Sequence, residues 1–502
     1  MKRLTIAAAT GASLSLAVAT PTAGAVPSAA TSITWGPCTD PSLVQGGAEC
    51  GSLAVPLDRS KPYGRTIQLA LARVRHKVPD SAYQGILLTV PNPLGGVGLT
   101  SPLLASRLPN GAGDAYDWVG FARRGLAPSV PALTCVPDYF GFNRPDYVTT
   151  TPSAERPWLD RVRGYADACA SNDDQADLLA HMKTTDTASD MESIRIALGT
   201  DHLNLYSEAY GTYVAQVYAT LFPSRVRRMV LDGSVDPRRV WYGAAAFDQD
   251  VPLERNLHIW FDWLASHDDV YHLGATRDAV HRVWNEQVSK VTSTPAAGAV
   301  GPDEWIDLFL FPAYTQDTFS LLGSVFSNFV NKGDDATLKA LFTQFYQQPG
   351  NENTYAALLA EVCTDAPWPT NWRQWRADSN ATNAQAPNTT WGNTWFNAPC
   401  LFWHAKPSKP VPIDGYGVQS ALLIVETLDA VTPLEGSLEV RSRFPNSALI
   451  SEPGGTTYSG TLRGNTCVDS KIAAYLTTGA LPARKPGRQA DVACAPLPLP
   501  NP

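Results

Sequence analysis

The stretch of sequence that decides the fold is Leu203-Asn-Leu-Tyr-Ser-Glu-Ala-Tyr-Gly211, which continues into Thr212-Tyr-Val-Ala-Gln-Val-Tyr-Ala-Thr-Leu-Phe-Pro223. An apolar strand leads here into a sharp turn and then into a helix, which is the setting of the G-x-S-x-G nucleophile elbow. The five motif positions are occupied by Ser207, Glu208, Ala209, Tyr210 and Gly211, so an alanine stands where the motif has its serine. A methyl group cannot attack a carbonyl carbon, and the chemistry therefore depends on the residues around this turn.

Strand-like and helical patterns alternate outward from this stretch in both directions. The alternation predicts an α/β fold with a mostly parallel sheet flanked by helices. We expect strands at Ile67–Arg73, Gly85–Val90, Asp117–Phe121, Leu203–Tyr206, Val226–Leu231, Ala421–Val425 and Ala448–Ser451. We expect helices at Thr187–Leu198, Tyr210–Phe222, Leu434–Arg443 and Val468–Thr477. Near-continuous apolar runs such as residues 86–88 and 422–425 fit strands that are buried on both faces.

Residues 236–405 break the alternation, because helical patterns dominate there and no run reads as a strand. Eleven of the 14 tryptophans fall in this segment: Trp241, Trp260, Trp263, Trp284, Trp305, Trp368, Trp372, Trp375, Trp391, Trp395 and Trp403. We predict a large helical, tryptophan-rich lid inserted between strands 6 and 7 of the sheet. Most of these rings should fill the core of the lid. A few should line a pocket, because open α/β sheets bind ligands at the carboxyl ends of their strands.

The two ends of the chain read as an export signal and a tail. Residues 1–25 combine a basic start, an apolar run and the small residues Ala23-Gly24-Ala25 before the cleavage point. No later stretch supplies the roughly 20 apolar residues that a membrane span requires. We therefore expect a secreted protein without a membrane anchor. Its predicted parts are a first core part at 26–235, the lid at 236–405, a second core part at 406–495, and a Pro-rich, disordered tail at 496–502.

The cysteines and the charge limit the kinds of partner. Eight cysteines lie beyond the signal: Cys38, Cys50, Cys135, Cys169, Cys363, Cys400, Cys467 and Cys494. An even number in an exported protein favours disulfides, and pairing each cysteine with its neighbour along the chain is the simplest connectivity. No CxxC occurs and only eight histidines are present, so we expect neither a metal nor a cofactor. A net charge of −8 without a basic cluster argues against a nucleic-acid partner.

Several motifs point together to one family. They are Leu53-Ala-Val-Pro-Leu-Asp58, Tyr116-Asp-Trp-Val-Gly120, Tyr210-Gly-Thr-Tyr-Val214, Arg227-Arg-Met-Val-Leu-Asp-Gly233, Thr427-Leu-Asp-Ala-Val-Thr-Pro433 and Gly464-Asn-Thr-Cys-Val-Asp469. As a set they resemble the secreted tripeptidyl-aminopeptidase-like branch of the α/β-hydrolase superfamily, which comprises serine peptidases related to prolyl aminopeptidases. The resemblance covers nearly all of the mature chain and implies the α/β-hydrolase fold.

The catalytic triad of that family is only partly retained. The family uses Ser, Asp and His in this order. Asp429 matches the family's aspartate in its Leu-Asp-x-Val-Thr-Pro context, whereas Ala209 stands at the serine position and Thr456 at the histidine position. No histidine follows His404. An introduced substitution would explain Ala209 alone, but it would not explain the second change.

The oxyanion side is altered as well. The family's glycine-rich loop after the third strand reads Asn92-Pro-Leu-Gly-Gly-Val-Gly98 here, so that Leu94 intrudes before Gly95 and Gly96. Backbone N–H groups of this loop, together with that of Tyr210, would bind the oxyanion. In a measured serine protease, loss of the serine or the histidine lowers kcat on the order of a millionfold, or ~8 kcal/mol. The sequence therefore predicts that ordinary Ser-His-Asp hydrolysis is lost.

Three carboxylates remain as candidate catalytic groups. Asp429 is the retained acid, Glu208 directly precedes the tip of the elbow, and Glu426 stands where the family usually has glycine. Burial among apolar groups would raise their pKa values and suit them to acid/base chemistry. The alternative for each of them is a structural role as a hydrogen-bonded buried acid.

The main interpretation from sequence is a retained, lidded apolar pocket for a peptide or hydrophobic small molecule in a non-hydrolytic role. That role would be either ligand binding or proton-transfer catalysis of the cyclase, isomerase or lyase type. The alternative is a hydrolase or peptidase that acts through unconventional groups, such as a carboxylate-activated water. The oligomeric state is left open.

Overall fold

The computed structural model describes residues 32–90, 98–149 and 151–502. The expected export signal and the loop residues Leu94, Gly95 and Gly96 lie outside the described residues. The eight cysteines form four disulfides: Cys38–Cys50, Cys135–Cys169, Cys363–Cys400 and Cys467–Cys494. The predicted pairing of neighbouring cysteines is therefore confirmed.

A ten-stranded sheet forms the centre of the described structure, in the order β1-β2-β3-β5-β4-β6-β7-β8-β9-β10. The strands are β1 (Thr34–Pro37), β2 (Glu49–Pro56), β3 (Thr66–Val74), β4 (Ile86–Val90), β5 (Asp117–Phe121), β6 (Leu203–Glu208), β7 (Val226–Asp232), β8 (Ala421–Glu426), β9 (Ser447–Glu452) and β10 (Val492–Ala493). Pairs from β5 to β10 along this order are parallel, whereas β1, β2 and β3 pair antiparallel. The seven predicted strands and the mostly parallel sheet are confirmed.

Helices cover both faces of the sheet. Those of the core are α1 (Pro41–Gln45), η1 (Asp80–Ala82), η2 (Ser101–Arg107), η3 (Pro109–Ala115), α2 (Pro152–Cys169), α3 (Asp173–Ala180), α4 (Thr184–Ala197), α5 (Gly211–Leu221), η4 (Pro223–Arg225), α17 (Leu434–Arg443) and α18 (Thr466–Thr478). Apolar side chains of α18 pack on one face of the sheet, and those of α4, α5 and α17 pack on the other. Because both faces are covered, the side chains of β4 and β8 are buried along their whole lengths, as their apolar runs predict.

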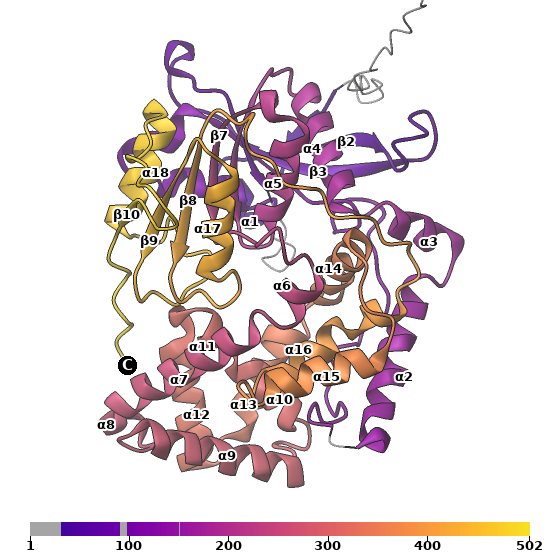
Figure 1. The fold of residues 1–502 in the computed structure, drawn as a ribbon, viewed down its shortest axis with the longest axis vertical. Helices are drawn as coiled ribbons and strands as arrows, with labels where there is room; N and C mark the ends of the chain where they lie inside the picture. Colours follow the sequence, from indigo (N-terminus) through magenta and orange to yellow (C-terminus); the bar gives the residue numbers. More distant parts are fainter. Residues whose placement is uncertain (1–31, 91–97, 150) are drawn as a thin grey trace, which may run out of the picture.

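The helical insert, defined here as residues 236–405, lies between β7 and β8 and forms a layer below the sheet in Figure 1. Its helices are α6 (Tyr242–Ala246), α7 (Asp250–Ser266), α8 (Asp268–Tyr271), α9 (Arg277–Ser293), α10 (Pro302–Phe309), α11 (Phe311–Tyr314), η5 (Gln316–Thr318), α12 (Phe319–Lys332), α13 (Asp335–Tyr346), α14 (Asn351–Asp365), α15 (Trp372–Asn383), α16 (Thr390–Asn397) and η6 (Ala398–Phe402). Nine of its eleven tryptophans are buried in hydrophobic clusters, which confirms that most of them fill a core. No helix in the described ranges has both the length and the hydropathy needed to cross a bilayer.

The C-terminal tail is ordered against the insert, and the expectation of a disordered tail is wrong. Its backbone carbonyls accept hydrogen bonds from side chains of the insert. Trp263 Nε1 donates to Pro500 at 3.1 Å, and Gln316 Nε2 donates to Pro498 at 3.1 Å. The end of the chain accordingly lies beside the insert in Figure 1. A proline-rich segment has few backbone N–H donors to satisfy, so it can lie in an extended form along another surface.

Candidate active site

The turn between β6 and α5 has the backbone geometry of a nucleophile elbow. Ala209, at its tip, has a φ of 47°, a left-handed conformation that non-glycine residues adopt rarely and mostly at functional turns. The N–H of Ala209 donates to the carbonyl of Asp232 at 2.9 Å, so the ladder between β6 and β7 continues up to the tip. Helix α5 begins at Gly211, and the positive end of its dipole therefore faces the turn. The elbow is intact in its backbone, while its tip carries a methyl group.

Ser207 and Glu208 lie on the strand side of this turn. Ser207 is buried and its hydroxyl donates to the carbonyl of Val90 at 3.4 Å, so it does not supply the missing nucleophile. Glu208 is half-buried and accepts a hydrogen bond from the Tyr206 hydroxyl at 3.0 Å. Burial, together with the charge of Asp232, raises the pKa of the Glu208 carboxyl to about 7.

Asp429 lies in the turn after β8 and is only 2% exposed. Its Oδ1 accepts from the backbone N–H groups of Val431 at 2.8 Å and Thr432 at 2.9 Å, and its Oδ2 accepts from Thr432 Oγ1 at 2.7 Å. A carboxylate has about four acceptor sites, so Oδ2 retains one for a further donor. Burial raises the pKa of Asp429 to about 7, although the donors from Thr432 and Val431 lower it. The carboxyl can therefore take up or release a proton near neutral pH.

The strand register places further acids side by side at this edge of the sheet. Glu208 pairs with Asp232 between β6 and β7, and Glu426 pairs with Glu452 between β8 and β9. Neighbouring carboxylates disfavour one another's charged form. Burial, with the neighbouring acids, raises the pKa of Glu426 to about 8 and that of Glu452 to about 7. This edge therefore retains protons at pH values where exposed carboxyl groups have lost theirs.

The loop that carries Thr456 is built around Glu426. Glu426 Oε2 accepts from the backbone N–H of Thr457 at 2.6 Å. A Cβ atom on Gly455 or Gly460 would come within 2.4 or 2.5 Å of the Glu426 carboxyl oxygens, so the loop needs both glycines to accommodate this side chain. The buried Thr456 Oγ1 has no hydrogen-bond partner among the described residues. The chain thus uses Glu426 to support the loop in which the sequence comparison places Thr456 at the family's histidine position.

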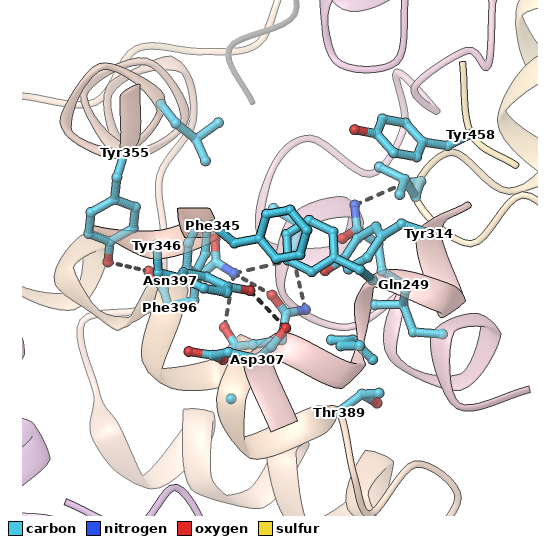
Figure 2. A pocket seen from close by; sticks show the side chains of 18 of the residues that line it. Gln249, Asp307, Tyr314, Phe345, Tyr346, Tyr355, Thr389, Phe396, Asn397 and Tyr458 are labelled. Atoms are coloured by element: carbon cyan, nitrogen blue, oxygen red, sulfur yellow. Dashed lines mark hydrogen bonds between the residues drawn. The ribbon is translucent and has the colours of Figure 1, made fainter. Parts of the chain in front are cut away.

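A cavity of about 450 Å³ lies between the insert and the elbow (Figure 2). It reaches the elbow at Tyr210 and the Asp429 turn at Val431, whereas Ala209 and Asp429 are not among the described residues of its wall. Its aromatic lining consists of Phe140, Tyr147, Tyr210, Phe311, Tyr314, Phe345, Tyr346, Tyr355, Phe396 and Tyr458. No tryptophan of the described residues lines this cavity, so the expectation that tryptophan rings would do so is wrong. Those rings are used in the packing of the insert instead.

One acid of the described wall, Asp307 on α10, faces this cavity and had no signal in the sequence. Arg144 lies 2.7 Å from its Oδ2, and the Tyr147 hydroxyl donates to it at 3.0 Å. Glu304 binds the same guanidinium at 3.2 Å, and burial raises the pKa of the nearby Asp303 to about 9. Burial also raises the pKa of Asp307, against the opposing effect of Arg144. Asp307 and Glu304 therefore share the one guanidinium of Arg144. Figure 2 shows Asp307 in the wall of the cavity.

Helix α7 connects the insert to the turn that holds Asp429. Gln249, which caps the start of α7, donates from Nε2 to the carbonyl of Val431 at 2.9 Å. Arg255 and Asn256 both donate to the carbonyl of Leu428, at 2.6 and 2.9 Å. The insert therefore holds backbone carbonyls on both sides of Asp429.

Fold and site together define the class of protein. A mostly parallel sheet, a left-handed elbow between a strand and a helix, and an acid after a later strand are the features of an α/β-hydrolase. The family described as TAP-like protein matches residues 386–494. Similar solved structures include an acetylester hydrolase from Corynebacterium glutamicum, with 12% identity and a TM-score of 0.39 over 87% of this chain and 96% of that one.

The chain belongs to the tripeptidyl aminopeptidase family, and the predicted resemblance is confirmed. It is 36% identical over 481 residues to the tripeptidyl aminopeptidase of Streptomyces coelicolor, which covers 94% of this chain and 87% of that protein. It is 28% identical over 481 residues to the serine protease Hip1 of Mycobacterium tuberculosis, which covers 90% of this chain and 89% of that protein.

These relatives correct the function predicted from the sequence. Both are named as peptidases, and the similarity extends over nearly the whole chain, including the insert. The prediction of a non-hydrolytic role, either binding or cyclase-, isomerase- or lyase-type catalysis, is therefore wrong. That prediction rested on Ala209, Thr456 and the altered oxyanion loop at Leu94. Hydrolysis, the alternative, agrees better with the family.

Proposed function

We propose that this protein is a secreted peptidase that removes residues from the amino end of peptides, with a water molecule in place of the serine nucleophile. The observation that carries this proposal is the 36% identity to a tripeptidyl aminopeptidase over 94% of the chain. The cavity beside the elbow supports it, because a space of about 450 Å³ is large enough for a short peptide segment. Secretion is supported by the four disulfides and by the export-signal pattern of residues 1–25.

Asp429 is the base in this proposal. Its remaining acceptor site on Oδ2 holds the water, and a pKa of about 7 suits proton uptake at neutral pH. The water oxygen bonds to the scissile carbonyl carbon while its proton passes to Asp429. That proton then moves to the leaving nitrogen as the C–N bond breaks, which yields a carboxylic acid and an amine. The N–H of Tyr210, at the start of α5, binds the oxyanion that forms in between.

The amino end of the substrate occupies the larger cavity in this proposal. Glu304 and Asp307 share the single guanidinium of Arg144, which leaves the Asp307 end of the cavity short of one positive charge. A substrate ammonium group would supply that charge, and buried carboxylates gain most from a paired cation. The tyrosine and phenylalanine rings of the wall offer contact area to apolar side chains. The preferred substrates are therefore short peptides with a free amino end and apolar residues.

The test is a peptide series in water enriched in oxygen-18, analysed by mass spectrometry. Each peptide is offered with a free and with an acetylated amino end, and the protein is used with and without prior fluorophosphonate treatment. We expect labelled amino-terminal fragments from the free peptides, at least about tenfold less product from the acetylated ones, and no effect of fluorophosphonate. Absence of product from every peptide would contradict the proposal. Loss of activity after fluorophosphonate would contradict the water nucleophile.

A further inference from the structure

A second cavity, of about 260 Å³, also lies against Tyr210. It is formed by the segment after β7, by residues around α6 and by the start of α17. Tyr210 and Val431 line both cavities. A wall of about one side chain therefore separates the two spaces, and this wall stands directly beside the elbow.

Gln249 fixes the two parts of this wall to each other. Its Nε2 donates to the Tyr210 hydroxyl at 2.6 Å and to the Val431 carbonyl at 2.9 Å. The Tyr210 ring is held from another side by Trp241, with ring centroids 5.4 Å apart. Gln249 belongs to the insert, whereas Tyr210 and Val431 belong to the core. The wall consequently depends on one amide group contributed across the boundary between insert and core.

The smaller cavity is electrically balanced. Three acids line it, and each is paired with an arginine outside its wall: Asp236 with Arg238 at 2.6 Å, Asp248 with Arg239 at 2.6 Å, and Glu435 with Arg488 at 2.5 Å. Apart from Tyr210 and Val431, the rest of its wall is small or uncharged: Val235, Ala244, Thr432, Pro433 and Gly436. Such a space suits an uncharged stretch of peptide better than a charged group, in contrast to the Asp307 end of the larger cavity.

We propose that Gln249 keeps the two cavities apart and thereby sets the length of the peptide that the protein binds. The smaller cavity receives the uncharged residues of a peptide that is too long for the larger cavity alone. In the closed arrangement, the hydrogen bonds of Gln249 keep the two cavities apart and favour short peptides. When the amide leaves this position, a longer peptide continues past Tyr210 into the smaller cavity. This inference rests on the proposed function, because the larger cavity is taken to hold the amino end.

The test measures binding and not hydrolysis. Alanine peptides of three and six residues, with free amino ends, are titrated calorimetrically into the Asp429→Asn protein and into the same protein carrying Gln249→Ala, Gln249→Leu or Asn256→Ala. Asn256→Ala is the matched control, because Asn256 lies on the same helix and also donates to a core carbonyl but lines neither cavity. Gln249→Leu removes the donors and keeps the bulk of the side chain.

We expect Gln249→Ala to bind the longer peptide about tenfold more tightly and the shorter one unchanged within about twofold. Gln249→Leu should show a smaller gain, and Asn256→Ala should show none. Equal changes for both peptides, or an equal gain in the Asn256 variant, would mean that the insert has merely loosened and would overturn the inference. Absence of binding in all forms would overturn it as well. If peptides bind with this length preference but wild-type protein hydrolyses none, only the proposed function fails.

Discussion

The edge of the sheet around the elbow and the cavity beside the insert differ in how much of each can be recognised in the sequence and in which chemical groups each contains. At the edge, every group stands in a recognisable position, yet Ala209 and Thr456 lack the atoms that a serine hydrolase needs. In the cavity, no sequence motif marks the lining, yet an acid and ten aromatic rings line one space. The chain therefore lacks two catalytic side chains at the edge but keeps a large cavity beside the elbow, which the proposed function assigns to the peptide. Whether the protein binds a substrate and whether it carries the groups for hydrolysis are therefore two separate questions.

Restoring the missing atoms should have the largest effect. The double variant Ala209→Ser, Thr456→His should raise kcat on short free peptides by on the order of a thousandfold or more, since serine and histidine act as a unit. Each single change should gain little. The measurement is kcat with a chromogenic tripeptide, together with covalent labelling by fluorophosphonate. A folded double variant that is labelled but hydrolyses no peptide would show that the cavity does not present a peptide to the elbow.

Removing the acid of the cavity should weaken binding and leave the chemistry largely intact. Asp307→Asn should raise KM for peptides with a free amino end at least about tenfold, because it removes an ion pair with the substrate, while kcat changes little. Acetylated peptides provide the control, since they lack the ammonium group and should respond within about twofold. An equal rise in KM for both kinds of peptide would indicate a general distortion around Arg144 and would argue against an amine site.

A smaller effect concerns the stability of the sheet edge. The pKa of Glu426 is about 8 in the folded protein against an ordinary value of 4.5. A carboxyl with a raised folded pKa contributes stability that is fully present below the ordinary pKa and is lost as the pH rises through about 8. Glu426→Gln should therefore flatten the fall of the free energy of unfolding between pH 5 and pH 8, by on the order of a few kcal/mol at the upper end, and a series of Tm measurements against pH checks this. Glu435→Gln, on the exposed face of α17, is the control, and an identical pH dependence in both variants would contradict the account.

The smallest effect is expected at the C-terminal tail. Deletion of residues 496–502 removes the acceptors of Trp263, Gln316 and Ser320, and each hydrogen bond contributes about 1 kcal/mol. Hydrogen exchange should accelerate in α12 and in the second half of α7, while the sheet remains protected. Trp263→Phe should reproduce part of this effect without shortening the chain. Unchanged exchange in the insert would show that the tail contacts contribute nothing to its stability.

The parts that could be predicted from the sequence are those with a local physical signal. Apolar runs marked β4 and β8, the strand-turn-helix pattern marked the elbow, and neighbouring cysteines marked the disulfides. Asp429 could be placed because it stands in the Leu-Asp-x-Val-Thr-Pro context of the family, and in the structure Val431 and Thr432 bind its carboxyl. Glu426 could be singled out as unusual, but its support of the loop depends on Gly455 and Gly460, which lie on another segment.

The sequence predicts a lidded pocket but not the residues that line it, because these come from segments far apart in the chain. Asp307 lies on α10, Gln249 caps α7 and Tyr458 follows β9, and only the packing of the insert on the core brings them to one space. The many tryptophans drew attention to the insert, but large rings were needed for its core, and the smaller tyrosine and phenylalanine rings line the cavity. The ordered tail was missed because its hydrogen bonds use backbone carbonyls, which every sequence has.

The proposed activation of water by Asp429 can be tested through the pH dependence of kcat/KM for peptide hydrolysis. For the wild-type protein we expect kcat/KM to rise with pH and to level off above about pH 7, because the carboxyl must be ionised to accept the proton of water. Asp429→Asn should lower kcat/KM at least about 100-fold and abolish this inflection, whereas Glu426→Gln should retain it. An Asp429→Asn protein that hydrolyses peptides at the wild-type rate with the same pH profile would contradict the account.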